Sequence, residues 1–172
     1  MTKSRQGALI GVLVLVAVGL MFMAGCKGKS LSEKIAEKAI EKASGGKAKV
    51  DVGSGSLKIQ TKEGEVEMGA ASKWPSEIPE DVPKFEAGQF ESSTRMSVEN
   101  GTSWIMGIKD VEADAVTGYV QALKDAGWNE GLSSDSDKTY HFQVEKDKYG
   151  VMLIYDKEGK NLAYTFILKT KE

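Results

Sequence analysis

Few side chains in this 172-residue sequence could carry out covalent or acid–base chemistry. Cys26 is the only cysteine and His141 the only histidine, so the ligand set of a structural zinc site is missing. His141 lies in an alternating stretch typical of a strand, and no serine occupies a nucleophile-elbow motif. We therefore expect no catalytic residue and no metal site.

Carboxylates are the other chemical candidates. Glu112 and Asp114 stand at an expected helix start, where the helix dipole favours negative charge without any catalysis. The Ser/Asp-rich stretch 133–137 could offer oxygen ligands to calcium. It lacks the glycine of a calcium loop, and Lys146 stands at the twelfth position where glutamate is required, so we expect a solvated loop. An alternative function, a hydrolase, would use Glu112, Asp114, Asp135 and Asp137.

Cys26 closes an uncharged stretch, residues 7–26, that follows a basic start. A basic start, an apolar centre and small residues at the exit are the parts of a secretory signal. The final residues from Met23 on, Met-Ala-Gly-Cys, resemble the lipobox of bacterial lipoproteins, with methionine where leucine is usual. The resemblance implies that residues 1–25 are a signal peptide, that cleavage falls between Gly25 and Cys26, and that the sulfur of Cys26 is acylated.

Two other interpretations of the N-terminal stretch stay open. About 20 uncharged residues are long enough to cross a bilayer as an uncleaved helical anchor, and an ordinary signal would release a secreted protein.

The lipoprotein resemblance implies a diacylglyceryl group on Cys26 as the only cofactor, and two acyl chains give stable attachment. Lys27 replaces the aspartate that commonly retains such proteins on the inner membrane. We therefore expect an extracytoplasmic protein anchored to the cell membrane or envelope, on the outer membrane where one exists.

The charge of the mature chain limits its partners. Residues 26–172 carry 21 basic and 25 acidic side chains, a net charge of −4. No block of Lys and Arg stands out, so we expect no nucleic acid partner. With Cys26 acylated no disulfide can form, and stability must come from packing. The expected partners are membrane lipid, through acylated Cys26, and an envelope protein or a small ligand.

Three segments precede the C-terminal domain. Residues 26–46 hold the lipidated N-terminus and an amphipathic helix that begins with a capping box at Ser30. This helix either lies on lipid headgroups or pairs with a partner helix, or it docks on the protein's own sheet. Residues 47–72 alternate in three short runs and predict a small β-meander. Residues 73–87 contain every proline and predict an extended segment, either a spacer or a strap anchored by Trp74, Ile78, Val82 and Phe85. This order resembles a group of uncharacterised bacterial lipoproteins, and the resemblance implies no activity.

Residues 88–172 show the pattern of an α+β domain. Two alternating runs joined by a hairpin turn at residues 99–101 come first. A helix follows, from Asp110 as its expected N-cap to about Ala126. Three further strands complete the pattern. The order ββαβββ predicts an antiparallel sheet with one helix packed on one face.

The sheet face opposite the helix is unusually apolar. Alternation places nine residues there: Ile105, Gly107, His141, Gln143, Met152, Ile154, Ala163, Thr165 and Ile167. Five of the nine are aliphatic or methionine. A face open to water should be mostly polar. Either the meander and the strap cover it, or it is a surface for a partner or ligand, or the apolar residues are scattered without a role. The candidate binding face consists of Ile105, His141, Gln143, Met152, Ile154 and Ile167.

These features together predict a lipid-anchored bacterial cell-envelope lipoprotein whose C-terminal module binds or scaffolds and catalyses nothing. One alternative is a cell-wall or envelope hydrolase that uses the carboxylates named above. The other is a purely structural lipoprotein that self-associates through the helix of residues 30–44.

Overall fold

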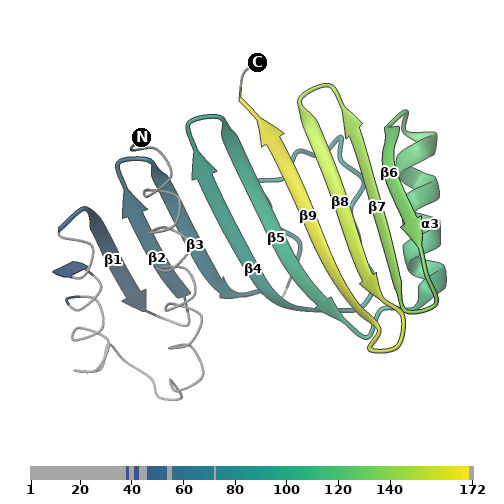
Figure 1. The fold of residues 1–172 in the computed structure, drawn as a ribbon, viewed down its shortest axis with the longest axis horizontal. Helices are drawn as coiled ribbons and strands as arrows, with labels where there is room; N and C mark the ends of the chain where they lie inside the picture. Colours follow the sequence, from purple (N-terminus) through teal and green to yellow (C-terminus); the bar gives the residue numbers. More distant parts are fainter. Residues whose placement is uncertain (1–37, 39–40, 43–45, 54–55, 72, 171–172) are drawn as a thin grey trace, which may run out of the picture.

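A computed structural model describes residues 38, 41–42, 46–53, 56–71 and 73–170 (Figure 1). The expected signal peptide, Cys26 and most of the helix expected over residues 30–44 lie outside the described residues. Within the described part, no helix has both the length and the apolar character needed to cross a membrane.

The described chain is dominated by one antiparallel sheet of nine strands (Figure 1). Across the sheet the strands follow the order β1-β2-β3-β4-β5-β9-β8-β7-β6. Their bounds are β1 Ala48–Gly53, β2 Ser56–Thr61, β3 Gly64–Ala70, β4 Gln89–Val98, β5 Gly101–Lys109, β6 Asn129–Asp135, β7 Thr139–Lys146, β8 Tyr149–Asp156 and β9 Asn161–Lys169. The fold is therefore the α+β class that the sequence predicts, with a higher share of strand.

The three strands of the predicted meander are confirmed, and they extend the same sheet as the later strands. Along the β3–β4 ladder Gly64 lies opposite Val98 and Ala70 opposite Ser92, so pairing spans the whole length of β3. The hairpin turn after β4 is also confirmed, because Val98 pairs with Gly101 across two turn residues. One continuous sheet therefore positions every surface described below.

The helix α3 spans Ala113–Asp125 and packs on one face of the sheet. The prediction that Asp110 caps it is wrong: Asp110 has a φ of 54°, and the N-cap is Glu112, which makes no side-chain capping bond. Asp110 instead forms the bend that leaves β5. The predicted stop after Ala126 is confirmed, since Gly127 adopts a φ of 81° and donates its N–H to the carbonyl of Lys124.

An additional strand separates the observed order, ββαββββ, from the predicted ββαβββ. β6 pairs with β7 in the region that includes the expected loop 133–137. All seven β6 residues are exposed, and the register shifts between Glu130 and Ser133. The strand therefore depends on backbone hydrogen bonds at a sheet edge, and it carries no alternating apolar pattern that would reveal it.

The main core lies between the sheet, α3 and the Pro-rich strap, residues 73–87. Three strap residues are buried to 3% exposure or less, Ile78, Val82 and Phe85, and Trp74 packs beside them. The predicted anchors therefore pack into the core, but the expected extended course is wrong: the segment turns at Pro75 and Pro79, whose carbonyls accept hydrogen bonds from the residues three positions on. The strap and the helix cover the same face of the sheet.

Candidate functional site

The candidate binding face predicted from sequence lies on the side of the sheet opposite the helix and the strap. Antiparallel pairing places Ile105 opposite Thr165, and Thr165 opposite Met152, so the three share one face across β5, β9 and β8. Gln143 continues this row on β7 because it pairs with Met152. The register thus brings all six predicted residues onto one surface, which we call the outer face: Ile105, His141, Gln143, Met152, Ile154 and Ile167.

The expectation that the meander and the strap cover the outer face is wrong. Ile105, Met152 and Ile167 remain 36–40% exposed. The strap lies on the helix side because Trp74 packs edge-on against Tyr164, with ring centroids 5.0 Å apart. The meander extends the sheet sideways and covers neither face of β5, β8 or β9. The outer face over these central strands is therefore open.

The chemistry of the outer face is apolar at its centre and polar toward β7. His141 is exposed and pairs with Ile154, and Gln143 is half-buried beside Met152. The surface offers no arrangement of nucleophile and base. An apolar centre bordered by hydrogen-bonding side chains is the composition found in protein–protein interfaces.

The outer face is also apolar at β1 and β2, where four buried residues form a second cluster: Ala48, Val50, Leu57 and Ile59. Leu57 pairs with Met68, which pairs with Thr94, which in turn pairs with Ile105. This row carries the second cluster and the open apolar patch along one side of the sheet. The main core lies on the other side.

A groove on the helix side of the sheet was missed by the sequence analysis. It has a volume of about 340 Å³ and lies between β3–β5 and the start of the strap. Arg95 contributes to its wall and lies over the Trp104 ring, 5.9 Å from the ring centroid. The other lining residues are Ser56, Glu67, Gly69, Ala70, Ala71, Lys73, Trp74, Pro75, Ser76, Glu77, Ser93 and Trp104.

Two indole groups in this groove lack hydrogen-bond partners among the described residues. The Nε1 atoms of Trp74 and Trp104 are both buried and unpaired, as is that of Trp128 outside the groove. Buried donors of this kind usually find a partner, since leaving one unsatisfied costs free energy. Beside them, Glu65 binds Arg95 at 3.5 Å and Lys58 at 2.9 Å, which fixes the charged wall. No pattern along the sequence indicates this site, because strand register alone brings Arg95, Glu65 and Trp104 together.

Two of the four carboxylates proposed for a hydrolase, Glu112 and Asp135, have partners near the β8–β9 turn. Glu112 accepts a hydrogen bond from the Lys160 ammonium at 2.6 Å, and this bond raises the pKa of Lys160 above its ordinary value. Asp135 accepts one from the Lys157 ammonium. Both pairs are exposed at the surface. Among the described residues, no three His, Cys, Asp or Glu side chains gather closely enough to hold a metal ion.

Comparison with known proteins adds no relative to this picture. No protein-family model, curated protein or solved structure matches the chain.

Proposed function

We propose that this chain is a lipid-anchored lipoprotein of a bacterial envelope that binds another envelope protein through the outer face. The lipobox resemblance of residues 23–26 supports the anchor.

The observation that carries the binding proposal is the open apolar patch on the central strands. Ile105, Met152 and Ile167 are exposed on neighbouring strands, although open antiparallel faces are normally polar. The patch lies on a sheet face, whereas the groove described above lies on the helix side. A flat apolar surface with polar side chains at its border fits a protein surface better than a small molecule.

The test is co-purification with substitutions that map the contact. The acylated protein is cross-linked in its native envelope and purified with its partners. We expect Ile105→Glu combined with Ile167→Glu to reduce a captured protein at least tenfold. Leu132→Glu is the matched control, because Leu132 is a 79% exposed apolar residue on β6. Equal capture by the outer-face variant and the wild type would contradict the proposal.

The groove supports a second candidate function, the binding of a small polar ligand. The specific observation is the pair of buried, unpaired indole donors of Trp74 and Trp104 beside Arg95. The indole N–H resonances report on it directly when a low-molecular-weight envelope extract is added. We expect the Trp74 and Trp104 signals to shift, whereas Trp128, which lies outside the groove, serves as the internal control. Shifts of all three signals, or of none, would count against this site.

A further inference from the structure

We propose that the end of the sheet formed by β1 and β2 faces the membrane and that its lysines contact anionic phospholipid headgroups. This surface, the basic edge, consists of Lys38, Lys42, Lys47, Lys49 and Lys62. The inference rests on the proposed N-terminal attachment to a membrane and adds which side of the domain meets the bilayer.

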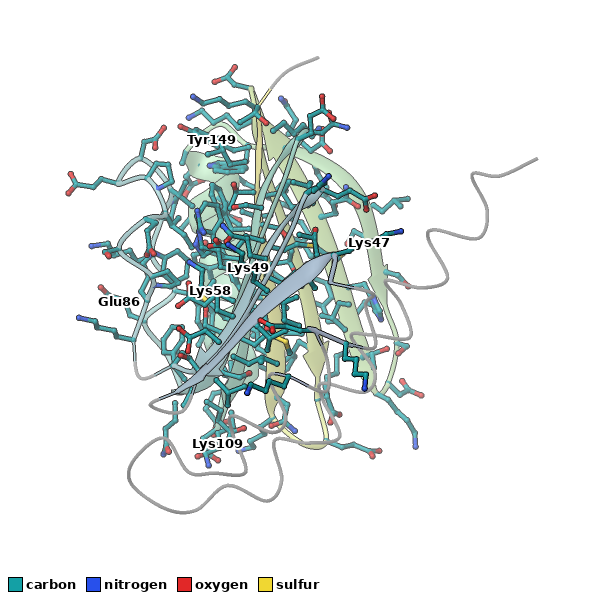
Figure 2. The ribbon with its side chains drawn as sticks, turned by 90° about the vertical axis from the view of Figure 1, so that its left-hand side faces the viewer. Lys47, Lys49, Lys58, Glu86, Lys109 and Tyr149 are labelled. Atoms are coloured by element: carbon teal, nitrogen blue, oxygen red, sulfur yellow. The ribbon has the colours of Figure 1, made fainter. Side chains whose placement is uncertain are left out.

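Strand register and two hydrogen bonds bring the basic edge together. Ala48 pairs with Thr61, so Lys47 and Lys62 lie at the same end of β1 and β2. Glu41 is helical and lies between Lys38 and Lys42 in the chain. Its side-chain carboxylate accepts a hydrogen bond from the backbone N–H of Val50 at 3.4 Å, and its backbone carbonyl accepts one from the N–H of Gly46 at 2.9 Å. Figure 2 looks onto this edge and shows Lys47 and Lys49 on it. β1 is the last strand of the sheet at this end (Figure 1).

The charges of the basic edge are available to a partner. All five lysines are exposed, and none forms an ion pair with a carboxylate of the described residues. Lys58, the other lysine of the β1–β2 hairpin, differs because it pairs with Glu65 at 2.9 Å. Six lysines elsewhere in the described chain are likewise paired with carboxylates, whereas Lys73, Lys84 and Lys148 are not; the paired ones are Lys109, Lys124, Lys138, Lys157, Lys160 and Lys169.

The whole mature chain has the charge asymmetry that such an orientation needs. Residues 26–62 carry nine basic and four acidic side chains, whereas residues 63–172 carry 12 basic and 21 acidic ones. The part next to the anchor is therefore positive and the remainder negative. An anionic bilayer attracts the first part and repels the second, and both forces turn the same edge toward the lipid.

Proximity to the anchor along the chain favours lipid as the occupant of the basic edge. Cys26 lies 21 residues before Lys47, so β1 is the strand joined to a membrane attachment at Cys26 by the shortest stretch of chain. Attraction to an anionic surface acts within a Debye length of roughly 8–10 Å at physiological salt. Each lysine near such a surface favours contact by roughly fivefold, so three of them favour this orientation by about a hundredfold.

Energy transfer to labelled headgroups measures the orientation. The protein purified from its membrane is placed in nanodiscs of either phosphatidylcholine or phosphatidylcholine with phosphatidylglycerol. A fluorophore is attached at Gln60→Cys on β2 or at Ser134→Cys on β6, one position at a time. If Cys26 carries a free thiol, Cys26→Ser keeps the label unique, and the apolar stretch 8–24 serves as the tether. We expect stronger transfer from position 60 than from position 134 in the anionic discs only.

Charge reversal separates the basic edge from net charge. The triple variant K47E/K49E/K62E should abolish the difference between the two positions, as should high salt. The matched control K84E/K138E/K148E makes the same charge change on other parts of the surface and should preserve it. Unfolding curves for both variants confirm that they fold. Equal transfer from both positions in anionic discs, or equal loss in the control, would overturn the proposal. Mass spectrometry of the peptide that contains Cys26, from the same preparation, tests the lipid anchor separately.

Discussion

The hydroxyl groups of Tyr119 and Tyr164 lie 2.8 Å apart inside the core. Tyr119 on α3 donates to the carbonyl of Pro83 in the strap at 2.7 Å, so Tyr164 on β9 donates to Tyr119. Phe85 packs edge-on against Tyr119 with ring centroids 5.2 Å apart. The tyrosine pair therefore joins helix, strap and sheet on one side, and this arrangement leaves the outer face open.

Removing the Tyr119 hydroxyl should destabilise the protein. Tyr119→Phe leaves the Pro83 carbonyl and the Tyr164 hydroxyl without their partner, and we expect a loss of about 1–3 kcal/mol in the free energy of unfolding. Urea unfolding measures it. Tyr140→Phe is the control: its hydroxyl bonds to no described residue, and the change should stay below about 0.5 kcal/mol. Equal stabilities of the two variants would show that the hydroxyl pair contributes nothing.

The same pair predicts a loss of stability in alkali. Burial raises the pKa of Tyr119 above its ordinary value, and burial together with the neighbouring Tyr119 raises that of Tyr164. Unfolded tyrosines release their protons near pH 10 while these two keep theirs, so the unfolded state binds fewer protons and stability falls as pH rises above about 10. Tyrosinate absorbance of the native protein should therefore stay incomplete until unfolding. Full ionisation of all five tyrosines in the folded state would contradict this.

Two isoleucine truncations should separate the strap from the outer face. Ile78→Ala opens a cavity beneath the strap, where Ile78 is 3% exposed, and should cost about 2–5 kcal/mol. Ile105→Ala removes the same atoms from a side chain that is 40% exposed and should cost less than about 1 kcal/mol. Denaturant unfolding compares them. A large loss for Ile105→Ala would mean that the outer face is covered.

Two glycine substitutions around α3 should act in opposite directions. Gly118 lies within the helix with no atom near its missing side chain, so Gly118→Ala should stabilise by about 0.5–1 kcal/mol. Gly127 has a φ of 81°, so Gly127→Ala should destabilise by about 1–2 kcal/mol. Thermal unfolding of both variants gives the sign of each effect. A gain for Gly127→Ala would contradict the assigned helix end.

Eight of the nine strands could be predicted because residue types alternate along them in the sequence, and in several of them burial alternates as well. In β8, for example, Val151, Leu153 and Tyr155 are buried, whereas Met152 between them is exposed. β6 could not be predicted because none of its side chains enters the core. The prediction that Asp110 is the N-cap was wrong because it relied on side-chain type alone. Aspartate fits an N-cap, but the backbone bends at Asp110 with a positive φ.

The position of the strap and the groove could not be derived from sequence. Apolar spacing showed that Ile78, Val82 and Phe85 are anchors but not which face of the sheet they meet. That choice depends on the Tyr119–Pro83 hydrogen bond and on aromatic contacts between distant segments. The outer face was predictable as a set of residues, since alternation alone assigns them to one side. Its exposure was not, because it depends on where the strap lies.

The mass of the native protein tests the central claim most directly. The account predicts a chain that begins at Cys26 and carries the added mass of a diacylglyceryl group, with or without a third acyl chain on its amine. Fragmentation should place that mass on Cys26 itself. A native protein that retains residues 1–25 and a free Cys26 thiol would contradict the lipid anchor.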